Sequence, residues 1–220
     1  MVEFRNCSKH IQTIIRMANE IAEKYKFENT DELIEAAHEI RSKSLHGEMP
    51  PTFLMQDLSN LLFDSGISFA VIGAIALSIH GQVRGTDDID VLVSDIPSRM
   101  PDTDYMRKFN FYRSKSSTGA GAVIDHRTNG MVELLLANNP LRQWSIDTAT
   151  KIMVLGVEVP VVSPAALIGL KTQAMVNNPK RASKDAPDIL SVWIKLKPDL
   201  SEVKQFLNTQ ELAALESIIT

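Results

Sequence analysis

Asp88 and Asp90 are the residues whose types and spacing point most directly to chemistry. One residue separates them in the segment DDIDVLV, whose pattern predicts a strand over Ile89–Val93. Because alternate side chains of a strand share a face, both carboxylates point the same way, and Ile89 and Val91 point to the core on the other face. Adjacent carboxylates repel each other unless a cation lies between them, and such oxygen ligands suit Mg²⁺ bound to substrate phosphates. The other interpretation is that Asp87 and Asp88 cap a turn.

Gly73 lies where a short apolar strand, Phe69–Ile72, is followed by a helix that continues to Ile79. A helix N-terminus presents free N–H groups and the positive end of the helix dipole, and glycine lets a triphosphate approach the backbone closely. The segment from Gly73 to Asp88 is long enough for one short helix and a loop, so the two strands can lie side by side. The phosphate-binding helix N-terminus at Gly73 and the pair of metal ligands are then expected to face one crevice. The alternative is that Gly73 only forms a tight turn.

The segment Phe69–Val93 resembles the signature of nucleotidyltransferases of the DNA polymerase β-like superfamily. That signature has a glycine followed by Gly or Ser, a helix, and then Asp-x-Asp or Asp-x-Glu on the next strand. Here it reads Gly73-Ala74 and Asp88-Ile89-Asp90. The resemblance implies an α+β fold with a small mixed β-sheet, in which the backbone at Gly73 and Ala74 binds the nucleotide. Ala74 keeps the backbone N–H of the usual residue but lacks a serine hydroxyl.

The resemblance extends beyond this signature, over about residues 67 to 192, and does not explain residues 1–50. HGQVRGTDDIDVLV is most similar to the minimal and AbiEii-like nucleotidyltransferases, and SPAALIGLKTQAM followed by KRASKDAPDI resembles their downstream helices. It implies that Lys171 reaches the triphosphate and that Lys184 and Asp185 match family positions in the nucleotide site. A lysine on an apolar helix face can instead extend its ammonium to water. Arg84 either contacts phosphate from its loop or is a solvated loop charge.

Glu133 is the candidate for the third carboxylate that this superfamily requires. It is the one charge in the apolar strand MVELLL, and an unpaired buried charge is unfavourable without a partner or a cation. A two-residue turn at Asn129-Gly130 places Glu133 opposite His126 on the same face. The alternatives are a solvent-exposed Glu133 on an edge strand or a plain Glu133–His126 pair, and Asp125 is the fallback ligand if the register differs. Glu133 is one methylene longer than the usual Asp, which could displace one ion of a two-metal site.

Charged residues cluster between Lys180 and Asp188. Arg181 and Asp185 are four residues apart, as are Lys184 and Asp188, so helix-surface ion pairs would explain part of the cluster.

The elements that must position these residues divide the chain into three parts. They are an N-terminal helical segment (1–50), a nucleotidyltransferase core (51–163) and a C-terminal helical region (164–220). Further predicted core elements are a helix over Leu54–Phe63, a short helix over Tyr105–Phe111, a hairpin of Ala122–Arg127 with Met131–Leu136, and a strand pair of Ile152–Leu155 with Val157–Val162. Ser163 and Pro164 predict the start of a helix, and interruptions are expected at Asn177–Pro179, Pro187 and Pro198.

Composition narrows the class of protein. The 220 residues are 44% hydrophobic and 23% charged, which excludes a disordered or collagenous chain. The net charge of −4 argues against indiscriminate nucleic-acid binding, and a single cysteine excludes a disulfide framework. Because no apolar run reaches the ~20 residues of a membrane span and the N-terminus lacks a secretory signal pattern, we expect a soluble, cytoplasmic protein with no membrane partner.

Three functions are therefore considered. The first is an enzyme that uses Mg²⁺ or Mn²⁺, held by Asp88, Asp90 and Glu133, to transfer a nucleoside monophosphate from a nucleoside triphosphate such as ATP. Its acceptor would be a hydroxyl of an RNA end, a protein or a small molecule such as an aminoglycoside, and several AbiEii-like proteins are toxins of toxin–antitoxin pairs. The second is a non-catalytic nucleotide sensor or partner-binding module whose N-terminal helices dock a protein. The third is a generic α+β protein without metal binding.

Overall fold

Seven strands of the described part of the chain form a mixed sheet at the centre of the molecule, with strand order β3-β4-β5-β2-β1-β7-β6. The computed structural model describes residues 51–82, 86, 88–95, 109–113, 120–125, 130–154 and 156–220, so the predicted N-terminal helical segment lies outside the described residues. The strands are β1 (Phe69–Val71), β2 (Asp88–Val93), β3 (Phe109–Arg113), β4 (Ala120–Asp125), β5 (Gly130–Leu136), β6 (Thr150–Val154) and β7 (Val157–Val161). The predicted α+β class is confirmed.

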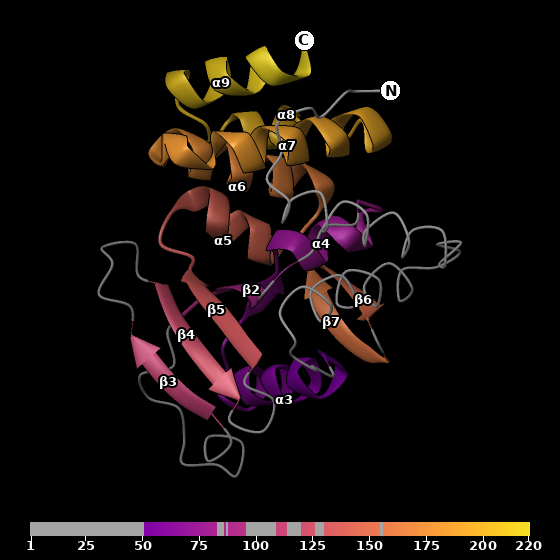
Figure 1. The fold of residues 1–220 in the computed structure, drawn as a ribbon, viewed down its shortest axis with the longest axis vertical. Helices are drawn as coiled ribbons and strands as arrows, with labels where there is room; N and C mark the ends of the chain where they lie inside the picture. Colours follow the sequence, from indigo (N-terminus) through magenta and orange to yellow (C-terminus); the bar gives the residue numbers. More distant parts are fainter. Residues whose placement is uncertain are drawn as a thin grey trace, which may run out of the picture.

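Helices cover both faces of this sheet (Figure 1). The helix α3 lies on one side, whereas α4 and α5 lie between the other side and a layer formed by α6 to α9. The helices are α3 (Pro51–Asp64), α4 (Gly73–Ile79), α5 (Pro140–Asp147), α6 (Pro164–Asn177), α7 (Ala182–Leu196), α8 (Ser201–Lys204) and α9 (Thr209–Ile219), with a 3₁₀ helix, η2 (Pro179–Arg181), before α7. No helix within these described ranges is long and apolar enough to cross a lipid bilayer.

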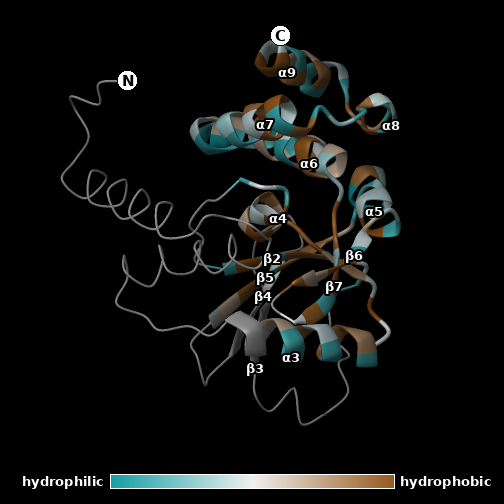
Figure 2. Ribbon diagram, turned by 90° about the vertical axis from the view of Figure 1, so that its right-hand side faces the viewer, coloured by the Kyte–Doolittle hydropathy of each residue, from teal (hydrophilic) through white to brown (hydrophobic). Residues whose placement is uncertain are grey.

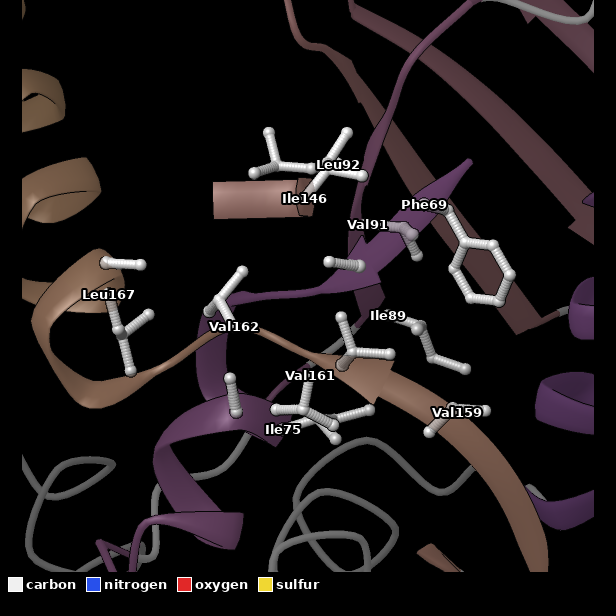
Figure 3. Close-up of a cluster of buried hydrophobic side chains, with 14 of the residues drawn as sticks. Phe69, Ile75, Ile89, Val91, Leu92, Ile146, Val159, Val161, Val162 and Leu167 are labelled. Atoms are coloured by element: carbon white, nitrogen blue, oxygen red, sulfur yellow. The ribbon is translucent and has the colours of Figure 1, made fainter. Parts of the chain in front are cut away.

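The central strands carry the core. β1 pairs with β2 in antiparallel fashion and with β7 in parallel, so Val71 lies between Val91 and Val161. Figure 2 shows brown, apolar residues through the centre of the sheet, and Figure 3 shows Ile89 and Val91 among the packed side chains. Ile89 and Val91 are 1% and 0% exposed, which confirms the predicted alternation along β2. Burial of each such side chain stabilises the fold by ~1.5–3 kcal/mol. Because Ile89 and Val91 are fixed in the core, Asp88 and Asp90 are kept on the opposite face of β2.

Several predicted elements are confirmed. The strands predicted at Phe69–Ile72 and Ile89–Val93 lie side by side, and the two predicted strand pairs correspond to β4 with β5 and β6 with β7. Ser163 is the N-cap of α6, and its hydroxyl accepts a hydrogen bond from the backbone N–H of Ala166 at 3.1 Å.

Other predictions are wrong. Residues 109–113 form strand β3 paired with β4, not the end of a helix over Tyr105–Phe111, because the alternating aromatic residues of FNFYR favour a pleated strand. Pro187 lies inside α7 and does not interrupt it. Pro187 is close to the start of α7, so the hydrogen bond that it cannot make is one to the first turn of the helix. The buried residues Ile189 and Val192 hold the helix against the core. The helix α5 was not predicted, although Asn139 as N-cap and Pro140 at the first position signal its start.

Candidate active site

Three carboxylates converge where β2 and β5 run side by side. The two strands are parallel, with Asp90 directly opposite Glu133, and Asp88 precedes Asp90 on the same face of β2. One carboxylate oxygen from each of Asp88, Asp90 and Glu133 lies within 4.8 Å of the others. The two aspartates are partly buried and Glu133 is exposed. We call these residues the acidic triad, and their hard oxygen donors form a set that suits Mg²⁺ or Mn²⁺.

Glu133 reaches the triad through a different register from the predicted one. It pairs with Ala122, not with His126, and the paired ends of the hairpin are Asp125 and Gly130. The connection is therefore longer than the two-residue turn expected from Asn129-Gly130, and residues 126–129 lie outside the described part of the chain. Because the displacement is an even number of residues, Glu133 stays on the predicted face of the sheet. Glu133 itself belongs to the triad although the register differs, so the fallback ligand Asp125, at the end of β4 that pairs with Gly130, is not needed.

Gly73 is in direct contact with this triad. Its φ of +65° is in the left-handed region, and a Cβ placed on it would lie 1.9 Å from Oδ2 of Asp90. The N–H of Ile72 donates a hydrogen bond of 2.9 Å to the backbone oxygen of Asp90. Any side chain at position 73 would therefore displace the Asp90 carboxylate. Gly73 and the buried Ala74 begin α4 beside the triad, in the predicted arrangement of strand, glycine and helix.

We expect Gly73→Ala to damage the triad beyond its backbone cost. Gly66→Ala is the matched control, because Gly66 has an almost identical φ of +66° and a Cβ placed on it would have nothing within 4 Å. The control should lose about 1 kcal/mol of unfolding free energy from the positive φ alone. Gly73→Ala should lose about 1–3 kcal/mol more and weaken Mg²⁺ binding about tenfold or more. Urea unfolding and Mg²⁺ titration measure both effects, and equal losses in the two variants would contradict the close contact.

Asp88 is oriented by a neighbouring hydroxyl. Oγ1 of Thr86 lies 3.0 Å from Oδ1 of Asp88 and 2.9 Å from its backbone oxygen. Asp88 is the first residue of β2 and one of the triad, and the alternative in which it caps a turn together with Asp87 stays a prediction. Asp87 and Arg84 lie outside the described residues.

The charge of Glu133 is disfavoured by its surroundings. Partial loss of water around its carboxyl group raises the pKa of Glu133 above its ordinary value, and repulsion from the Asp88 carboxylate raises it further. The positive charges of Arg181 and Lys184 oppose this rise in pKa. Two cations, one from η2 and one from α7, therefore act on the Glu133 carboxylate of the triad.

Glu133→Gln is expected to stabilise the metal-free protein at pH 7. A pKa that is higher in the folded state means that the folded chain binds the proton more tightly than the unfolded chain, so stability falls as pH rises above about 4.5, the ordinary value. At pH 7 in a chelator, the variant should therefore have a higher melting temperature than the wild type. Its free energy of unfolding should be higher by less than about 1 kcal/mol, because the carboxylate is exposed and screened. The difference should vanish near pH 4, and added Mg²⁺ should stabilise the wild type more than the variant. A lower melting temperature of the variant at pH 7 would refute this.

Lys171 lies in a buried ion-pair network between α6 and α7. Its ammonium is 3.1 Å from Oδ1 of Asp185 and 2.7 Å from Oδ2 of Asp188. Lys171 is 6% exposed and Asp185 is 0% exposed, so the alternative in which the ammonium extends to water is wrong. The predicted pair of Arg181 with Asp185 is confirmed, with Nε 2.7 Å from Oδ2.

Arg181 interacts electrostatically with the triad, and the sequence interpretation did not identify it. The pKa of its guanidinium is raised mainly by the hydrogen bond to Asp185, with further contributions from the charges of Asp185, Asp90 and Glu133. The spacing to Asp185 gave Arg181 a sufficient local explanation, whereas its interaction with Asp90 and Glu133 depends on how η2 packs with α6 and α7. Lys184 lies on the exposed surface of α7, near enough to Glu133 for its charge to lower the pKa of that residue.

Comparisons with known proteins identify the fold. No family model and no curated protein sequence matches the chain significantly. The crystal structure of an antigenic nucleotidyltransferase-like protein from Paracoccidioides brasiliensis aligns with a TM-score of 0.52 at 21% identity, over 76% of this chain and 86% of that one. The crystal structure of ANT(2")-Ia in complex with adenylyl-2"-tobramycin aligns with a TM-score of 0.52 at 15% identity, over 76% and 98% of the two chains. A solution structure of ANT(2")-Ia gives a TM-score of 0.51 at 16% identity, over 76% and 91%.

These similarities extend over most of each chain and agree with the sheet and helices described above. At such identities they establish the fold and not the reaction. The chain has a nucleotidyltransferase-like fold that carries an acidic triad on two adjacent strands, in an arrangement consistent with a divalent metal site.

Proposed function

We propose that this protein is a Mg²⁺-dependent nucleotidyltransferase that transfers a nucleoside monophosphate from a nucleoside triphosphate, such as ATP, to a hydroxyl group. The observation that carries the proposal is the position of the acidic triad, on β2 and β5 directly against Gly73, within a fold shared with nucleotidyltransferases. Similar carboxylates on a chain with another fold would carry less weight, because acidic clusters are common on protein surfaces.

The triad residues fit a divalent ion chemically. Asp88, Asp90 and Glu133 would hold Mg²⁺ or Mn²⁺, since all three offer carboxylate oxygens. Without a cation, partial loss of water and the charge of Asp88 raise the pKa of Glu133. When bound, the metal neutralises phosphate charge and lowers the pKa of the acceptor hydroxyl. The core packing of Ile89 and Val91 keeps the two aspartates on one face before substrate arrives, so little reorganisation is needed.

Other residues of the chain would position the triphosphate. The absence of a side chain at Gly73 leaves the Asp90 carboxylate undisturbed, and the backbone of Ala74 adjoins it. Lys184, exposed on α7 and electrostatically coupled to Glu133, supplies a positive charge for a phosphate. Lys171 and Asp185 support the nucleotide site by fixing α6 against α7. The acceptor oxygen bonds to the α-phosphorus as the bond from that phosphorus to the bridging oxygen breaks, releasing pyrophosphate and the hydroxyl proton.

The acceptor is proposed only by class: an RNA end, a protein side chain or a small molecule. The complex of ANT(2")-Ia with adenylyl-2"-tobramycin supports a small-molecule acceptor such as an aminoglycoside, because its fold is similar over 98% of its length. The resemblance of HGQVRGTDDIDVLV to AbiEii-like proteins supports a different setting, a toxin–antitoxin component acting in the cytoplasm.

A label-transfer assay tests the proposal. The purified chain is offered each of the four α-labelled nucleoside triphosphates with Mg²⁺ or Mn²⁺, and with total RNA, cell protein or an aminoglycoside panel as acceptor. We expect label to move to one acceptor class, and a chelator to abolish the transfer. Metal-dependent nucleotide binding without transfer would favour the sensor function instead. Neither binding nor transfer would contradict both functions.

A further inference from the structure

A chain of ion pairs connects the buried helical layer to the acidic triad. Lys171 of α6 pairs with Asp185 and Asp188 of α7, and Asp185 in turn pairs with Arg181 of η2. The Asp185 carboxylate is 0% exposed and takes contacts from two cations, so its position is fixed on both sides. Arg181 is therefore held by a carboxylate that is itself held, which limits the rotamers open to a long side chain.

The Arg181 guanidinium donates hydrogen bonds to Asp185 from one edge, and the side chain is partly exposed to solvent. Nε lies 2.7 Å from Oδ2 of Asp185 and Nη2 lies 3.5 Å from Oδ1. Its side chain is nevertheless 44% exposed. A guanidinium carries five N–H donors in a planar fork, so this pairing leaves donors for a second anion.

The charge of Arg181 interacts with two residues of the triad. Asp90 and Glu133 both act on the Arg181 charge, and Arg181 acts on Glu133. Arg181 is thus bonded to Asp185 and also interacts with the charges of two residues of the triad. Lys184 also acts on Glu133, but its side chain is exposed and its ammonium is a point charge on a flexible stem.

We propose that Arg181 is a substrate-binding residue that contacts the β- and γ-phosphates of the nucleoside triphosphate, the part that leaves as pyrophosphate. This inference rests on the proposed function and assigns within it a role that the motif resemblance gave to Lys171. The Lys171 ammonium is enclosed by two carboxylates, whereas Arg181 is partly exposed, held in place by Asp185 and close enough to Asp90 and Glu133 for their charges to act on it. A fixed guanidinium loses less conformational freedom on binding phosphate than a mobile lysine does.

The test compares nucleotides that differ only in the phosphates that Arg181 is proposed to hold. Dissociation constants are measured by calorimetry with Mg²⁺ for AMP and for an ATP analogue with a methylene group between the α- and β-phosphorus, which prevents release of pyrophosphate. The proteins are full-length wild type, Arg181→Gln, Arg181→Lys and Lys180→Gln. The last is the matched control, since it removes the same charge from the adjacent exposed position in η2.

We expect Arg181→Gln to weaken binding of the ATP analogue about tenfold or more and to change AMP binding less than about twofold. Arg181→Lys should fall between wild type and Arg181→Gln for the analogue, and Lys180→Gln should match wild type. The comparison of two ligands separates phosphate contact from a general loss of structure, and the lysine variant is informative if Arg181→Gln folds poorly. Equal losses for both ligands, or unchanged analogue binding, would overturn the assignment of Arg181. If wild type binds no triphosphate, the proposed function fails and this inference fails with it.

Discussion

Asp90→Asn is expected to reduce nucleotide transfer at least about a hundredfold, because the substitution removes one charged ligand from the centre of the triad. Asparagine has nearly the same size, so the contact with Gly73 and the backbone hydrogen bond to Ile72 should persist. The free energy of unfolding without metal should change by less than about 1 kcal/mol, since the lost repulsion from Asp88 and Glu133 offsets the lost attraction to Arg181. Label transfer and urea unfolding together measure the two sides of this prediction.

The matched control is Asp147→Asn, which removes the same charge from an exposed site at the end of α5. This control should retain transfer within about twofold of wild type, because surface charges far from the site have small effects. If Asp90→Asn retained transfer like the control, Asp90 would not be a metal ligand in the reaction.

Lys171→Met is expected to lower the free energy of unfolding by about 3–5 kcal/mol. Methionine fills most of the same volume but leaves the carboxylates of Asp185 and Asp188 buried without the ammonium between them. Loss of one partner from a buried ion pair is far more damaging than loss of a surface pair, since the remaining charges are poorly solvated. Urea denaturation followed by circular dichroism measures the change.

Lys151→Met is the control for this effect. Lys151 pairs with Glu158 at 3.2 Å, but the two side chains are 70% and 56% exposed. Its removal should change the unfolding free energy by less than about 1 kcal/mol. A similar small change for Lys171→Met would show that the network between α6 and α7 contributes little to stability.

The metal-ligand pair could be predicted from sequence because its geometry is local. The alternation of DIDV along one strand places Asp88 and Asp90 on one face whatever the rest of the chain does. Glu133 could be identified as a lone charge in an apolar strand. Its cross-strand neighbour could not be predicted correctly, because the length of a hairpin connection sets the register and Asn129-Gly130 suggested a shorter one than the observed pairing requires.

The cationic side of the site could not be predicted, because it depends on packing between distant elements. Helical spacing places Lys171 on an apolar face but does not say whether carboxylates of another helix enclose it there. Arg181 had a local partner at the expected spacing, and only the tertiary packing of η2 with α6 and α7 brings its charge within range of Asp90 and Glu133. Strand β3 was missed for a different reason, since aromatic residues in a short segment are compatible with either a helix or a strand.

Binding of Mn²⁺ tests most directly whether the acidic triad holds divalent cations. The free ion is followed by electron paramagnetic resonance as Mn²⁺ is added to the protein with the α,β-methylene ATP analogue. Wild type should remove Mn²⁺ from solution beyond the amount that the analogue alone binds, and Asp90→Asn and Glu133→Gln should each lose most of this excess. Equal Mn²⁺ binding by wild type and both variants would show that these carboxylates do not form a metal site.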